Sequence, residues 1–271
     1  MSTRGRVAIV ALVAVLGLGA LIGYWYDDAQ VTDSEPACTI AGAAMTIDPD
    51  QARSAATIAA VAVQRKLSER AVMIALATAL QESKLYNLDY GDRDSIGLFQ
   101  QRPSQGWGKP SDLKNPQYAA GAFYDALMKV PNWRTRPLTQ VAQAVQRSGY
   151  PDAYAQWEDT ARPLAAALMG SRAAGLNCNY DEPTKVASAD TVFADLSAEL
   201  PATRAGTADF SAPSPRDGWQ IASWLIANGQ RLGLYSVSYG GKTWSYNADA
   251  WKPASGGTAG AVHVTLTNPS S

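Results

Sequence analysis

The chain has 271 residues, which exceeds the usual length of one domain and predicts two folded units joined by a linker. Its 23 Lys and Arg nearly balance its 24 Asp and Glu, and no basic stripe is visible, so nucleic acid is excluded as the main partner. Hydrophobic residues make up 46% of the chain, which excludes a largely disordered protein.

The N-terminus has the pattern of a membrane anchor. Arg4 and Arg6 precede residues 7–26, a charge-free apolar run of about the 20 residues that cross a bilayer. The positive-inside rule places the N-terminus in the cytoplasm and the rest of the chain outside. We expect residues 1–28 to form a cytoplasmic stub and a single transmembrane helix at the cell membrane. A cleaved secretion signal is the alternative, although its apolar core is usually only about 7–15 residues.

Cys38 and Cys178 are the only cysteines of the chain. They bracket the helical region that follows the anchor, and an oxidising compartment outside the membrane would let them pair. Closing so long a loop contributes up to roughly 4–5 kcal/mol in the chain-entropy model. We expect a disulfide, with two separate buried thiols as the alternative.

Five helices are predicted in residues 29–180, which we expect to form a mainly α-helical domain. The signals for their starts and ends are, in chain order, Asp48-Pro49, Ser68 with an end near Ser83, Asn115-Pro116, Leu138 with an end near Arg147 that Gly149 can terminate, and Pro151 to Met169 with a kink at Pro163. Residues 84–111 hold three closely spaced aspartates and several glycines, which is typical of a loop or short hairpin.

The last part of the chain has a different pattern. Residues 181–214 are rich in Ala, Ser, Thr, Asp and Pro and predict a linker with one short helix near 191–200. Residues 215–271 predict a small α+β domain. Its elements are an amphipathic helix over 218–232 capped by Gly233, a hairpin around Gly240-Gly241, and a strand over 261–266.

Glu82 is the candidate catalytic residue. It lies near the end of the predicted helix that contains the apolar run 72–80, just before the polar loop. Apolar surroundings and the negative end of a helix both disfavour an ionised carboxylate and raise its pKa. A carboxylic acid needs such a raised pKa to protonate a glycosidic oxygen near neutral pH. The alternative is an ordinary solvated glutamate at a helix end.

Glu82-Ser83 followed by Gly97-Leu-Phe-Gln100 resembles the Glu-Ser and Gly-Leu-x-Gln signature of the lysozyme-like lytic transglycosylases. The stretch 87–108 is similar to an actinobacterial and phage branch of that family, and the resemblance covers roughly residues 45–170. It implies a lysozyme-like fold without a cofactor. It also implies that Glu82 cleaves the β-1,4 bond between N-acetylmuramic acid and N-acetylglucosamine in peptidoglycan, acting first as acid and then as base. Glycan strands are then the main partner, beside the membrane and further cell-wall or secretion machinery.

A lysozyme-type hydrolase would instead need a second carboxylate. Asp94 and Asp92 are the candidates, ahead of Asp89, although aspartates in such a loop also stabilise turns. The candidates for substrate binding share a polar or aromatic side chain near this loop or the later helix. They are Ser83, Gln100, Gln101, Tyr90, Trp107, Gln146 and Tyr150.

One motif departs from the family pattern. Family members often carry Ala-Tyr-Asn-Ala-Gly in a later helix, and its tyrosine contacts the catalytic acid. The corresponding place here is Ala144-Val145-Gln146-Arg147-Ser148, and valine cannot donate a hydrogen bond. Gln146 and Tyr150 are the candidate substitutes.

The tail of the chain resembles the small C-terminal domain found beside secreted actinobacterial cell-wall proteins, which is itself distantly similar to D-Ala-D-Ala zinc carboxypeptidases. The resemblance lies in residues 232–245, Trp251-Lys-Pro and Val262-His263-Val264. His263 is the only histidine, so we expect a degenerate module without a metal, in which His263 is structural or weakly binding. For the whole chain, a non-catalytic scaffold that grips glycan strands is a further alternative.

Overall fold

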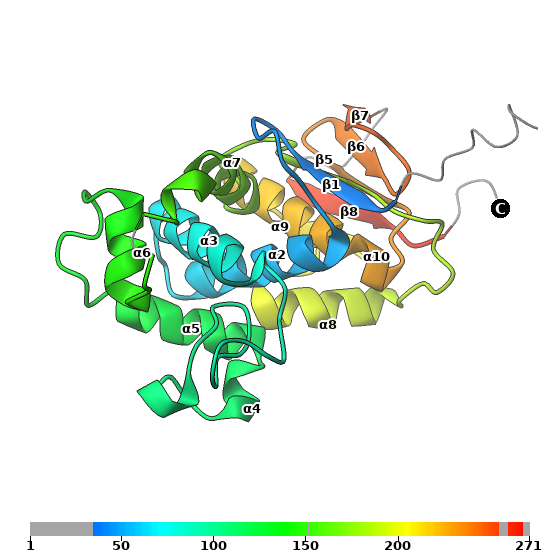
Figure 1. The fold of residues 1–271 in the computed structure, drawn as a ribbon. Helices are drawn as coiled ribbons and strands as arrows, with labels where there is room; N and C mark the ends of the chain where they lie inside the picture. Colours follow the sequence, from blue (N-terminus) through cyan, green and yellow to red (C-terminus); the bar gives the residue numbers. More distant parts are fainter. Residues whose placement is uncertain (1–34, 151, 255–259, 268–271) are drawn as a thin grey trace, which may run out of the picture. The chain divides into compact units, whose positions relative to one another are not determined.

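The computed structural model describes residues 35–150, 152–254 and 260–267. The described residues from Pro36 onward belong to one compact unit. In the described part of the chain, nine α-helices accompany antiparallel strands in two sheets (Figure 1). The predicted anchor at residues 1–28 lies outside the described residues. Among the helices that are described, none has the length and apolar character needed to cross a membrane.

The first part of the compact unit is helical and is built around one buried helix. Its helices are α2 (Pro49–Gln64), α3 (Glu69–Ser83), α4 (Pro110–Leu113), α5 (Pro116–Leu127), α6 (Leu138–Gln146) and α7 (Glu158–Leu168). Helix α3 packs against α2, α5, α6 and α7 (Figure 1). Every residue from Ala71 to Leu80 is buried. This surrounding core fixes the end of α3, where Glu82 lies.

Local capping chemistry accounts for several of the helix starts. Asp48 accepts a hydrogen bond from the Gln51 amide at 2.9 Å, and the Gln51 side chain accepts one from the Asp48 amide at 2.8 Å. These two reciprocal bonds form a capping box at the start of α2. The Asn115 side chain caps α5 in the same sense, by accepting from the Gln117 amide at 2.9 Å. The predicted starts at Asp48-Pro49 and Asn115-Pro116 are therefore confirmed.

The predicted end of one helix is confirmed and the predicted start of another was wrong. Helix α6 ends at Gln146 and is capped by Arg147, which adopts a left-handed φ of 53° and donates its amide to the Gln143 carbonyl, so Gly149 is not the cap. Helix α7 begins at Glu158 instead of Pro151, with the short 3-10 helix Ala155–Trp157 before it. The residues between these helices form a turn that buries Tyr154 completely.

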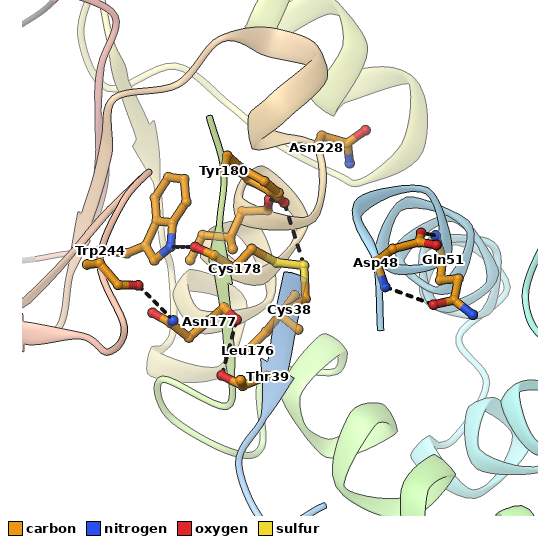
Figure 2. Close-up of a disulfide and its surroundings, with 12 residues drawn as sticks. Cys38, Thr39, Asp48, Gln51, Leu176, Asn177, Cys178, Tyr180, Asn228 and Trp244 are labelled. Atoms are coloured by element: carbon orange, nitrogen blue, oxygen red, sulfur yellow. Dashed lines mark hydrogen bonds between the residues drawn. A yellow bond between two sulfur atoms is a disulfide. The ribbon is translucent and has the colours of Figure 1, made fainter. Parts of the chain in front are cut away.

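A small sheet that the sequence did not predict joins the two ends of the helical part. Its strands β2 (Thr46–Ile47), β1 (Ala37–Ile40) and β3 (Leu176–Asn179) lie in that order, and Cys38 is directly opposite Cys178. The two sulfur atoms are bonded at 2.01 Å and both cysteines are fully buried (Figure 2). The predicted disulfide is confirmed.

The second part of the compact unit combines helices with a five-stranded antiparallel sheet. Its elements are α8 (Ala189–Glu199), β4 (Asp209–Ser211), α9 (Pro215–Ala227), α10 (Gly229–Leu232), β5 (Ser236–Tyr239), β6 (Lys242–Ser245), β7 (Lys252–Pro253) and β8 (Ala261–Thr265). The sheet order is β4-β8-β5-β6-β7. Gly240 and Gly241 have φ of 58° and 72° and form the tight turn between β5 and β6, as predicted.

The two parts pack directly on each other. The Trp244 indole donates to the Cys178 carbonyl at 2.7 Å, and the Tyr180 hydroxyl donates to the Ile226 carbonyl at 2.5 Å (Figure 2). Helix α9 also packs against α2 and α7, and Ser223 donates to the Ala167 carbonyl at 2.9 Å. The region predicted as a linker, residues 181–214, contributes α8 and β4 to this packing.

Candidate active site

Glu82 is held in a half-buried position at the last turn of α3. The ten residues from Ala71 to Leu80 are buried in the core, so the helix that carries Glu82 has little freedom. Burial raises the pKa of the Glu82 carboxyl above its usual value, and hydrogen bonds from Tyr154 and Gln146 oppose this by favouring the ionised form. The carboxyl can therefore hold its proton at a higher pH than an exposed glutamate.

Tyr154 is the principal partner of Glu82. Its hydroxyl donates to Glu82 Oε1 at 2.7 Å, and the ring is completely buried. Burial, together with the neighbouring Glu82 charge, raises the pKa of Tyr154, so the phenol stays protonated and remains a donor.

The turn that carries Tyr154 is fixed to α3 by the neighbours of Glu82. The Trp157 indole donates to Gln81 Oε1 at 2.8 Å, and Gln156 donates to the same oxygen at 3.0 Å. The Lys84 ammonium lies 4.0 Å from the centre of the Trp157 ring. Residues on both sides of Glu82 thus hold the turn that supplies its hydrogen-bond donor.

Gln146 is the second polar contact of Glu82. It is the last residue of α6, and its side chain hydrogen-bonds the Glu82 carboxyl. The Gln146 amide also donates to the Phe99 carbonyl at 2.7 Å. This amide therefore joins α6, the end of α3 and the Gly97-Leu-Phe-Gln turn, as expected for a residue of the site.

Ser83 connects the same turn to α3. Its hydroxyl is buried and bonds the Leu98 carbonyl at 2.7 Å and the Ala79 carbonyl at 3.1 Å. Ser83 therefore stabilises the packing of this turn on α3, because its hydroxyl already hydrogen-bonds to the protein backbone.

The two predicted glutamines after Gly97 also bond to the protein itself. The Gln100 amide donates to the carbonyls of Tyr90 and Gly97, each at 3.2 Å. Gln101 is 1% exposed and donates to the Ala119 carbonyl at 3.1 Å. These amides stabilise the loop, and the buried Gln101 side chain is not brought to the surface of the site.

The predicted aromatic residues lie in different surroundings. Tyr90 and Tyr150 are 72% and 78% exposed, on loops before and after the site. Trp107 is half-buried and lines a cavity of about 780 Å³ that Gln146 also lines. Trp107 and Gln146 are therefore the two predicted residues that line one hollow, and Glu82 itself is not part of its wall.

Each of the loop aspartates forms an ion pair with a basic side chain. Asp89 lies 2.7 Å from Lys114, and Asp92 lies 3.9 Å from the neighbouring Arg93. Asp94 lies 2.8 Å from Arg102 and also accepts hydrogen bonds from the backbone and hydroxyl of Ser104. The Arg102 side chain, with Ser104, holds the pKa of the Asp94 carboxyl well below its usual range.

These contacts limit which aspartate could act as a second catalytic carboxylate. Asp94 stays ionised, and both of its oxygens already accept hydrogen bonds in the loop. Asp92 is exposed, with 91% of its side chain accessible. Their arrangement is typical of residues that stabilise a loop.

Tyr154 is the site residue that the sequence analysis missed. The family tyrosine was sought at Val145, whereas the buried phenol comes from Ala153-Tyr154-Ala155, further along the chain. An Ala-Tyr-Ala run directly after the Pro151-Asp152 turn signal was the available clue. That segment was instead assigned to a regular helix.

Replacing Tyr154 by phenylalanine is expected to raise the pKa of Glu82 further. The change removes the donor that favours the ionised carboxylate and leaves the burial that disfavours it. Carbon-detected NMR titration of labelled glutamate carboxyls measures the shift directly. Tyr150→Phe, at an exposed tyrosine, is the control and should leave the titration unchanged. An unchanged or lowered pKa in Tyr154→Phe would contradict the assigned hydrogen bond.

The single histidine, His263, lies in the second sheet and is far from Glu82 in the sequence. His263 Nδ1 lies 2.9 Å from Asp209 Oδ1 on the neighbouring strand β4. Within the described residues, no group of three or more His, Cys, Asp or Glu side chains could hold a metal ion. His263 thus has a structural partner in the sheet.

The chain was also compared with known proteins. No protein-family model matches it, and no curated protein matches it.

Proposed function

We propose that this protein is a peptidoglycan lytic transglycosylase in which Glu82 is the general acid and base. The observation that carries the proposal is the half-buried Glu82 carboxyl, with its raised pKa, held by the buried Tyr154 hydroxyl at 2.7 Å. An acid with a raised pKa on a rigid helix end is suited to protonating a leaving oxygen. The helical part of the chain is accordingly proposed to be a lysozyme-like domain.

The reaction uses the same carboxyl twice. Glu82 donates its proton to the N-acetylglucosamine O4 as the bond from the muramic C1 to that oxygen breaks. The ionised Glu82 then takes the proton of the muramic 6-hydroxyl as this oxygen bonds to C1. The product is a 1,6-anhydro sugar, no water is consumed, and Glu82 regains its proton. Tyr154 and Gln146 stabilise the ionised carboxylate between the two steps.

The ion pairs of the loop favour this reaction over lysozyme-type hydrolysis. A two-carboxylate hydrolase needs a second group that is free to bind water or attack the sugar. The oxygens of Asp94 already accept hydrogen bonds from Arg102 and Ser104, and the lowered pKa of its carboxyl makes it a weak base. A lysozyme-type hydrolase that uses a second carboxylate stays the second candidate, and a glycan-binding scaffold stays the third.

The disulfide supports a location outside the cytoplasm. A buried disulfide is typical of proteins outside the reducing cytoplasm, as an enzyme that acts on the cell wall must be. We propose an extracytoplasmic enzyme attached by the apolar segment within residues 1–28. The sheet-containing C-terminal part is proposed to be the degenerate, metal-free carboxypeptidase-like module.

Mass analysis of the reaction products tests the proposal. Purified peptidoglycan incubated with the chain from residue 30 onward should yield anhydro-muropeptides, each lighter by one water than the corresponding hydrolysis product. Asp94→Asn should yield the same products, because Asp94 has no chemical role in this reaction. Products carrying the additional water would support hydrolysis instead. Binding of glycan without any cleavage would support the scaffold.

A further inference from the structure

The hollow lined by Gln146 and Trp107 is also lined by positive charge. Three basic side chains line the cavity of about 780 Å³, namely Lys129, Arg136 and Arg147, and its wall contains no acidic residue. In the part of the chain that the structure describes, none of the three forms an ion pair. Like charges around one hollow repel one another, and an anion bound between them would offset this repulsion.

Backbone contacts hold the residues that carry two of these cations. Arg147 caps α6 with a left-handed φ of 53°, a conformation that is unfavourable for a residue with a Cβ atom. Glycine is the usual residue at such a cap, so glycine could replace Arg147 and remove only its side chain. Arg136 is held through its carbonyl, which accepts a hydrogen bond from the Arg70 guanidinium, and through its amide, which donates to Asn132.

An aromatic residue completes the wall. Trp107 lies between two glycines, Gly106 and Gly108, with positive φ of 80° and 148°. The Tyr118 hydroxyl donates to the Trp107 carbonyl at 3.4 Å. The hollow thus combines an indole with cations and with the Gln105 and Gln146 amides, and its volume is within the range of about 300–1,000 Å³ typical of ligand sites.

We propose that this hollow binds the carboxylates of the stem peptide on the glycan strand, an inference that rests on the proposed function. The sugars of the strand offer no charge for three cations, whereas the peptide on each muramic acid ends in free carboxylates. Gln146 contacts Glu82 and also lines the hollow, so a peptide on the strand being cleaved can reach it. The guanidinium group of an arginine can bind a carboxylate through two parallel hydrogen bonds.

Two glycan substrates test this assignment. Peptidoglycan strands that carry stem peptides are compared with the same strands after an amidase has removed the peptides. The native chain should have a kcat/KM at least about tenfold higher on the peptide-bearing strands. In Arg136→Gln and in Arg147→Gly the ratio of the two values should fall toward one. Arg147→Gly keeps the backbone cap, so its loss of preference cannot come from an unfolded α6.

The control is Arg204→Gln, which removes a guanidinium from the C-terminal part and should keep the native ratio. Equal cleavage of both substrates by the native chain would overturn the proposal, as would an unchanged preference in the two cavity variants.

Binding measurements separate this proposal from the proposed catalysis. Isothermal titration of the native chain with the purified stem peptide should show binding that weakens about tenfold or more for the peptide amidated at its carboxylates. If no glycan is cleaved but this binding is present, the catalytic proposal fails and the carboxylate site stands. Absence of peptide binding overturns the site, as does equal binding of inorganic phosphate.

Discussion

Replacing Glu82 by glutamine should lower the rate of glycan cleavage by about 100- to 10,000-fold, because it removes the only proton donor assigned to the reaction. Glutamine keeps the size of the side chain and can still accept the Tyr154 hydrogen bond at the equivalent oxygen. The measurement is the rate of release of soluble muropeptides at saturating peptidoglycan. A folded Glu82→Gln protein with near-native activity would rule out Glu82 as the acid.

The same variant has an expected effect on stability, which serves as its folding control. Burial raises the folded-state pKa of Glu82 above the value of an exposed glutamate, so the native state binds this proton more tightly than the unfolded state. The contribution of Glu82 to stability is therefore fully present below the unfolded pKa and is lost as the pH rises through the folded pKa.

Glutamine does not ionise and avoids this loss. Urea denaturation should show Glu82→Gln to be at least as stable as the native chain at about pH 8, with its relative advantage smaller at about pH 4. A variant that is markedly less stable at the higher pH would contradict the burial assigned to Glu82.

Removing the disulfide should lower the free energy of unfolding by about 2–5 kcal/mol. Cys38 and Cys178 are 140 positions apart, so their bond restricts the unfolded chain over a very long loop. The double variant Cys38→Ala, Cys178→Ala tests this without leaving reactive thiols in the core. At about 2–4 °C per kcal/mol for a unit of this size, its Tm should fall by roughly 5–20 °C.

The position of the disulfide predicts how the protein unfolds. Trp244 donates to the Cys178 carbonyl, so a strand of the C-terminal sheet rests directly on the disulfide-bonded strands (Figure 2). We expect the helical part and the C-terminal part to unfold in one transition, at a lower temperature when the bond is absent. Reductant should lower the Tm of the native chain and leave the double variant unaffected. A native Tm that does not respond to removal of the bond would contradict the assigned contribution.

Short-range signals in the sequence were sufficient for much of the fold. Asp48-Pro49 and Asn115-Pro116 start helices because the capping oxygen and the amides that it satisfies lie within three residues of each other. Gly240-Gly241 makes the predicted hairpin because its positive φ angles favour glycine. Glu82 was predicted as the candidate acid from local signals of the same kind, namely the apolar run before it and the polar loop after it.

Only the tertiary structure decided which groups surround Glu82. The sequence offered Gln146 and Tyr150 in place of the tyrosine expected from the family resemblance, whereas folding brings Tyr154 to the carboxyl from 72 residues away. It also left open whether Asp94 or Asp92 is a second catalytic carboxylate, and their basic partners, above all Arg102 for Asp94, separate their roles. The sheet of β1 and β3 pairs residues 140 apart, and no local pattern encodes such a contact. The sequence by itself determined the helix that carries the acid, whereas the pKa of that acid depends on side chains that long-range packing assembles.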